Sequence, residues 1–221
     1  HKEYRRQRQM CIRDSIQRSP ILRSRVEAVQ IGREKSKKAQ TRELASVPYL
    51  FAERRAQAVP YLCIPRHVSE TRKYFIAQRF EPEVICGDAN FQTPDEDGVQ
   101  FALISSSMFI TWQKTVGGRL KSDLRFANTL TWNTFPVPEL NDIQRQKIIE
   151  AGKKVLDARA LHPKRSLAEH YNPLAMAPEL LKAHDALDRE VDKAFGAPRK
   201  LTTERQRQEL LFENYAKLVS R

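Results

Sequence analysis

Three groups of side chains in this sequence have the chemistry that binding to a polyanion requires. Lysine and arginine neutralise phosphate groups, and small hydroxyls donate hydrogen bonds to phosphate oxygens. Arginine and lysine also suit guanine edges in a major groove, whereas asparagine or glutamine suits adenine and a carboxylate suits cytosine. The groups are Arg66, Ser69, Arg72 and Lys73; then Arg119, Lys121, Ser122 and Arg125; and finally Lys37 with Lys38. Each group would also be ordinary as a solvated basic surface.

Acidic and amide side chains near these groups are weaker candidates. Gln92 and the run Asp95, Glu96 and Asp97 fit a purely structural pattern least well, so we name them as weak candidates for base contacts. Asp123 stands between basic residues. We expect it to be an ion-pair partner that orients Arg119 or Arg125, and not a contact to nucleic acid.

The net charge is unevenly distributed along the chain. The 221 residues include 39 Lys and Arg against 27 Asp and Glu, a formal net charge of +12. Residues 1–80 hold 19 basic and 7 acidic residues, residues 81–140 hold 4 and 8, and residues 141–221 hold 16 and 12. The positive field is therefore concentrated in the first third, which favours an anionic partner, and nucleic acid is the commonest one.

The sequence gives little support for a phosphate-binding loop, a metal site or a catalytic nucleophile. The seven glycines do not form a phosphate-binding loop, and the five histidines lack metal-ligand spacing, so we expect no metal or cofactor to bind here. Ser105–Ser107 lacks a nucleophile-elbow pattern, and His184 lies on an apolar helical stripe, so both are interpreted as structural. No apolar run is long enough to span a membrane. Three cysteines without a paired motif suit a reducing compartment, which predicts a cytoplasmic protein.

Hydrophobic periodicity predicts an α+β fold, with a mixed module first and helices alone afterwards. Helices are expected at 21–46, 101–116, 141–156, 178–195 and 203–218, and strands at 61–64, 73–80, 84–86 and 126–132. Residues 95–98 predict a turn, and the prolines at 136 and 138 mark a boundary. The expected domains are a mixed module with a small sheet over 16–138 and an all-helical domain over 139–221. Residues 1–15 contain a run, Gln9–Ser15, that resembles a translated sequencing adaptor, and they are excluded from this assignment.

An ordered set of motifs resembles one protein family. Ile64–Tyr74, Ser105–Trp112, Gly118–Phe126 and Trp132–Pro138 resemble segments of the target recognition domain of MmeI-like enzymes. These enzymes are fused restriction-modification proteins with adenine-specific methyltransferase relatives. Val155–Arg159, Leu180–His184 and Leu187–Asp192 look like the C-terminal helical domain of that family. The resemblance covers about residues 21–218, and it departs from the family pattern at His67–Thr71.

This resemblance implies a division of labour. A methyltransferase domain, N-terminal to this chain, would bind S-adenosylmethionine and a flipped adenine, and some relatives would add a nuclease domain. The present chain would recognise the double-stranded DNA sequence that determines which adenine is modified. Methyl transfer itself needs a glycine-rich cofactor turn and a polar-Pro-Pro-aromatic motif, and this sequence has neither. We therefore expect no methyl transfer from this chain alone.

Two alternatives belong to other functional classes. The chain could be a non-enzymatic specificity subunit that docks on a separate methyltransferase. It could also be a basic scaffold for nucleic acids or proteins, in which case binding would show no sequence preference.

Overall fold

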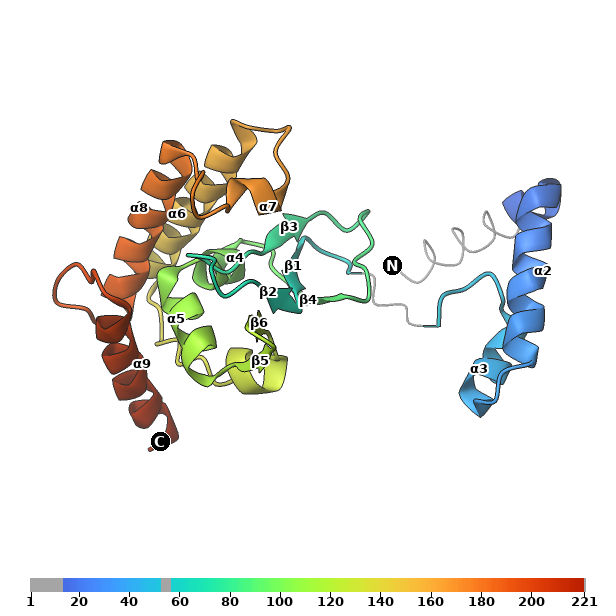
Figure 1. Cartoon of the computed structure of the whole chain (residues 1–221), viewed down its shortest axis with the longest axis horizontal. Helices are drawn as coiled ribbons and strands as arrows, with labels where there is room; N and C mark the ends of the chain where they lie inside the picture. Colours follow the sequence, from blue (N-terminus) through green and yellow to red (C-terminus); the bar gives the residue numbers. More distant parts are fainter. Residues whose placement is uncertain (1–13, 53–56, 221) are drawn as a thin grey trace. The chain divides into compact units, whose positions relative to one another are not determined.

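The computed structural model describes residues 14–52 and 57–220. The chain divides into two compact units, residues 1–55 and 56–221, and each is described by itself (Figure 1). Most of the adaptor-like run lies outside the described residues.

The first unit is helical. Helix α2 (Pro20–Glu34) begins at Ser19, whose side chain accepts a hydrogen bond from the Leu22 amide. The expected single helix over 21–46 is wrong, because α2 is followed by the short helix α3 (Ala39–Glu43) and the 3-10 turn η1 (Leu44–Ser46). Arg33 stabilises this break, since its guanidinium donates to the carbonyls of Leu44, Val47 and Leu50 at 2.7–3.0 Å.

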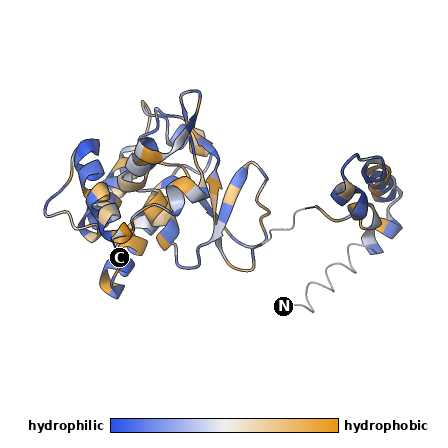
Figure 2. Cartoon of the chain, turned by 90° about the horizontal axis from the view of Figure 1, so that it is seen from below, coloured by the Kyte–Doolittle hydropathy of each residue, from blue (hydrophilic) through white to orange (hydrophobic). Residues whose placement is uncertain are grey.

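Helix α2 buries none of its side chains within the first unit. Four of its large apolar residues, Ile21, Leu22, Val29 and Ile31, are exposed, and Val26 is half-buried. The hydropathy colouring shows helices in both units that carry polar and apolar residues together (Figure 2).

The second unit begins with a three-stranded antiparallel sheet. Its central strand β1 (Tyr61–Pro65) confirms the strand expected at 61–64, and β3 (Gln78–Phe80) and β4 (Asn90–Pro94) flank it. The strand expected at 73–80 is therefore formed only at its end. The strand expected at 84–86 is wrong, because Val84 and Ile85 are exposed in a loop. Strand β4, which the sequence did not indicate, takes the place beside β1.

A second small sheet has the order β2-β6-β5. It is built from β2 (His67–Val68), β5 (Gly118–Leu120) and β6 (Asp123–Arg125). The register pairs His67 with Arg125 and Gly118 with Arg125, and all pairings are antiparallel.

The helix expected at 101–116 is two helices, α4 (Val99–Ile104) and α5 (Ser107–Val116). Ser106 separates them, since its hydroxyl donates to the Leu103 carbonyl and accepts from the Phe109 amide. The strand expected at 126–132 is wrong. A five-residue π-helix, η2 (Asn128–Trp132), occupies this stretch, and the Thr131 hydroxyl bonds to both backbone groups of Ala127.

The helices expected at 141–156, 178–195 and 203–218 are confirmed. They are α6 (Asp142–Ala160), α8 (Pro178–Ala194) and α9 (Glu204–Val219), with the short α7 (Leu167–His170) between the first two. Helix α6 lies beside α8, and α9 lies beside α5 (Figure 1). The sheets and helices share one hydrophobic core, in which Leu62, Ile104, Ile148, Leu187 and Leu211 are fully buried. The architecture is α+β, as predicted. None of the helices among the described residues could cross a membrane.

Candidate nucleic-acid interface

The sheet β2-β6-β5 brings two of the three basic groups together. Because β2 pairs with β6, the segment 66–73 and the segment 119–125 lie side by side although about fifty residues separate them. These two segments contain six Lys and Arg against two acidic residues. Five of the six are exposed: Arg66, Lys73, Arg119, Lys121 and Arg125. The sheet therefore brings the two basic segments side by side, and we call residues 66–73 and 119–125 together the basic sheet face.

The hairpin β5-β6 holds its polar groups toward solvent. Leu124 is fully buried in the core, so the alternation of a strand leaves its neighbours Asp123 and Arg125 exposed. The Gln113 side chain donates to the Arg125 carbonyl at 3.0 Å, which fixes the strand against α5. At the tip, Lys121 adopts a left-handed conformation with φ 56°, and both Lys121 and Ser122 are exposed.

Arg119 connects the two segments. Its guanidinium lies 3.1 Å from the Glu70 carboxylate and donates to the Ser122 carbonyl at 3.0 Å. The partner is therefore Glu70 and not the expected Asp123. Both side chains of the pair are more than 40% exposed, so the pair contributes at most about 1 kcal/mol to stability.

The other segment has a different set of contacts. The Arg66 guanidinium lies 5.2 Å from the Phe91 ring centre, and the Lys73 ammonium lies 5.4 Å from that of Tyr74. The hydroxyls of Ser69 and Thr71 are 3.1 Å apart. Arg72 is half-buried, and its guanidinium donates to the Ala168 carbonyl at 2.9 Å. Of the four residues named from the sequence, Arg72 is therefore the one whose side chain hydrogen-bonds to a distant part of the chain.

The remaining candidates lie elsewhere. Lys37 and Lys38 are exposed in the first unit, just before α3. Gln92 is half-buried on β4, opposite Cys63. Asp95 is buried and accepts hydrogen bonds from the amides that begin α4, and burial raises its pKa. Asp97 forms an ion pair with Arg145 at 2.6 Å.

Sequence reasoning did not select His67 or Glu70. His67 is exposed on β2 directly opposite Arg125, and Glu70 holds Arg119. Only the three-dimensional arrangement identifies them, because their partners Arg125 and Arg119 lie about fifty residues away in the sequence. Among the described residues, no group of three or more His, Cys, Asp or Glu is placed to hold a metal ion.

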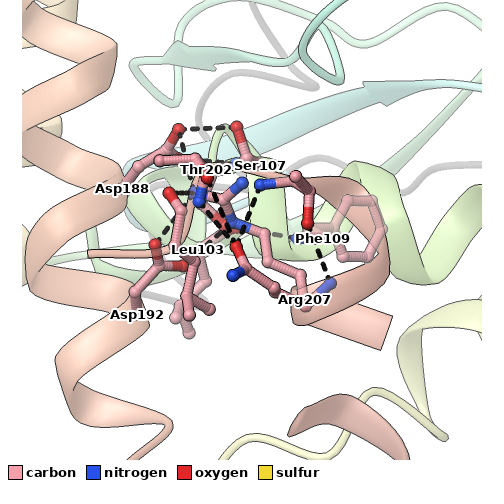
Figure 3. A network of polar contacts seen from close by, with 11 residues as sticks. Leu103, Ser107, Phe109, Asp188, Asp192, Thr202 and Arg207 are labelled. Carbon is pink, nitrogen blue, oxygen red and sulfur yellow. Dashed lines mark hydrogen bonds and ion pairs between the residues drawn. The ribbon is translucent and has the colours of Figure 1, made fainter. Parts of the chain in front are cut away.

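A polar network joins helix α5 to α8 and α9 (Figure 3). The Asp188 carboxylate accepts from the Ser107 amide at 2.7 Å and from the Ser107 hydroxyl at 2.5 Å, at the start of α5. Arg207 forms a two-pronged ion pair with Asp192 at 2.8 and 3.0 Å, and it lies 3.9 Å from Asp188. Burial raises the pKa of Asp188 to about 6, against the lowering effect of these hydrogen bonds.

The raised pKa of Asp188 predicts a pH-dependent difference between wild type and Asp188→Asn. The folded protein binds a proton on Asp188 more tightly than the unfolded chain does, so wild type gains stability relative to the variant as the pH falls. The gain should be roughly 1.4 kcal/mol for each pH unit between about 6 and about 4. Urea unfolding of both proteins at pH 7.5 and pH 5 measures it, and a difference that does not change with pH would show that Asp188 has an ordinary pKa.

Comparisons with known proteins match this chain to one system. The family models described as "MmeI, target recognition domain" and "MmeI, C-terminal domain" match residues 11–139 and 140–221. DNA methyltransferase A of Bacillus subtilis (strain 168) is 31% identical over 208 residues, which are 94% of this chain and 23% of that protein. A structure of the Type IIL restriction-modification enzyme MmeI in complex with DNA matches with a TM-score of 0.85 and 38% identity, over 94% of this chain and 28% of that chain. The chain thus spans about a quarter of the length of these relatives.

Proposed function

The chain belongs to the MmeI family, matching its target recognition domain and then its C-terminal domain, and from this premise we propose that it recognises a specific sequence in double-stranded DNA through the basic sheet face. The observation that carries the proposal is the pairing of β2 with β6, which places two exposed basic segments side by side. The structure of the relative MmeI was solved with DNA and has the same fold over this region, which supports a duplex as the partner.

The exposed side chains divide into two chemical roles. Lys73, Lys121, Ser122 and Arg125 are exposed and can donate to phosphates, which position a protein on the duplex. Arg66 and Arg119 are held by Phe91 and Glu70, and a held guanidinium suits the fixed geometry of a guanine edge. Ser69 is half-buried, and its hydroxyl would add a hydrogen bond to a phosphate. Lys37 and Lys38 of the first unit would add further phosphate contacts.

The proposal extends to the system in which this chain works. The DNA recognition domain would comprise residues 16–138, and residues 139–221 would form its helical support. A methyltransferase domain would bind S-adenosylmethionine and transfer the methyl group to an adenine N6 that the recognition domain selects. A cytoplasmic location would follow from this role, since the DNA to be modified is there.

The double substitution Lys121→Ala and Arg125→Ala tests the basic sheet face. Each phosphate contact that is lost should flatten the plot of log affinity against log salt by about 0.9, so the slope should change by up to about 1.8. Titration of a fluorescent duplex at several salt concentrations gives this slope.

A matched control removes the same charge elsewhere. Lys153 and Lys154 are exposed on α6, so Lys153→Ala with Lys154→Ala changes the net charge equally. We expect the control to keep the wild-type slope. Equal salt slopes for the two double variants would show that the hairpin β5-β6 does not contact DNA phosphates.

A further inference from the structure

The turn formed by residues 69–73 determines where several candidate DNA contacts lie. It closes with a hydrogen bond from the Arg72 amide to the Ser69 carbonyl at 3.1 Å. It carries Lys73 directly, and through Glu70 it holds Arg119 of the neighbouring segment. A turn of this length has no core of its own, so its conformation depends on what holds its end.

The first anchor of the turn is Arg72. Its guanidinium reaches the Ala168 carbonyl in α7, 96 residues further along the chain, at 2.9 Å. This contact ties the turn to the C-terminal helices at the place where the turn ends.

The second anchor is Tyr74. Its ring is fully buried and stacks on His184 of α8, with 3.7 Å between ring centres and 13° between planes. The Tyr74 hydroxyl is buried and has no hydrogen-bond partner among the described residues. The ring alone therefore holds Tyr74 in place.

His184 is in turn fixed by a chain of hydrogen bonds. The Tyr171 hydroxyl accepts from Nε and Nη2 of Arg159 at 2.9 and 2.5 Å and lies 2.8 Å from Nε2 of His184. Burial, together with the nearby Arg159 charge, lowers the pKa of His184 well below its usual value, so the ring is neutral. Because the Tyr171 oxygen accepts from arginine, its proton is donated to Nε2, which places the imidazole proton on Nδ1.

Arg159 also holds the C-terminal end of the segment formed by residues 72–78. Nη1 of Arg159 donates to the Ala77 carbonyl at 2.9 Å and lies 3.2 Å from the Gln78 side-chain oxygen. Helices α6, α7 and α8 thus hold residues 72–78 at both ends.

We propose that Arg72 and Tyr74 are positioning residues through which the C-terminal helices set the conformation of the 69–73 turn for DNA recognition. This inference rests on the proposed function, and it reassigns Arg72 from a DNA contact to an anchor. A preformed turn binds more tightly because less ordering is left to occur on binding.

Two pairs of variants test the proposal. Tyr74→Leu removes the stacked ring, whereas Tyr74→Phe keeps the ring and removes only the unpartnered hydroxyl. Arg72→Gln is too short to reach Ala168, whereas Lys121→Ala removes an exposed charge of the basic sheet face without touching an anchor. The readouts are hydrogen–deuterium exchange of the amides of residues 69–73 in the free protein, and the affinity and salt slope for a preferred duplex.

We expect Tyr74→Leu and Arg72→Gln to accelerate exchange in the turn about tenfold and to weaken binding roughly tenfold, while Tyr74→Phe behaves as wild type. Lys121→Ala should leave exchange unchanged and flatten the salt slope by about 0.9. Unchanged exchange in Arg72→Gln, together with a flattened slope, would overturn the proposal and restore Arg72 as a phosphate contact. Failure of wild type to bind any duplex would instead overturn the proposed function, and the exchange data would still decide whether the anchors hold the turn.

Discussion

Replacing Arg159 with methionine should lower the free energy of unfolding of the second unit by roughly 3–5 kcal/mol. Arg159 is only 6% exposed, and it is the hydrogen-bond donor to the Ala77 carbonyl, the Gln78 side chain and the Tyr171 hydroxyl. Methionine fills much of the same volume but donates nothing, so these buried oxygens lose their partner. Each such loss costs about 1–3 kcal/mol.

Tryptophan fluorescence during urea unfolding measures the free energy of unfolding of the second unit. Both tryptophans, Trp112 and Trp132, belong to the second unit, so the signal reports that unit alone. Lys154→Met is the control, because Lys154 lies exposed on the same helix and should change stability by less than about 0.5 kcal/mol. Equal midpoints for the two variants would mean that the Arg159 contacts contribute nothing.

Gly152→Ala should destabilise the second unit by about 1–3 kcal/mol, although alanine is the better helix former. In an open helix the substitution would stabilise by about 1 kcal/mol. In α6, however, a Cβ on Gly152 would lie 2.6 Å from the Ala102 Cβ and 3.2 Å from its Cα. Helices α4 and α6 must therefore move apart, and the cost of overpacking exceeds the gain in helix propensity.

A second substitution separates this clash from other effects. Ala102→Gly removes the closest atom, so it should cost less in the Gly152→Ala background than in wild type. The four free energies of unfolding form a double-mutant cycle, with an expected coupling of about 1 kcal/mol. Additive effects would show that the two helices tolerate the extra methyl group.

The helices near the C-terminus were predictable because their signals are local. Asn141 and Thr203 are hydrogen-bonded caps, Pro178 lies in the first turn of α8, and apolar residues recur at helical spacing. The sheet β2-β6-β5 was not predictable for the opposite reason. Its strands have only two or three residues, too few for an alternating pattern, and β2 is defined only by its pairing with β6, about fifty residues further along the chain.

The candidate site was predictable in composition and not in arrangement. The residue types of segments 66–73 and 119–125 indicated a polyanion surface, but nothing local showed that the two segments are neighbours. The roles of individual residues depend on distant partners. Arg72 contacts a carbonyl 96 residues away, and Glu70 holds Arg119 across the sheet. The apolar pair Val84 and Ile85 gave a false strand, because both side chains are exposed in a loop and β4 is the strand that pairs with β1 on this side.

Sequence recognition is tested most directly by selecting bound duplexes from a random DNA pool with the full 221-residue chain, at about physiological salt. A target recognition domain that reads bases through the basic sheet face should enrich one defined motif of several base pairs. Loss of that motif in Arg66→Ala or Arg119→Ala would further assign the reading to this face. Binding that enriches no motif would contradict sequence recognition and leave a basic scaffold as the description of this chain.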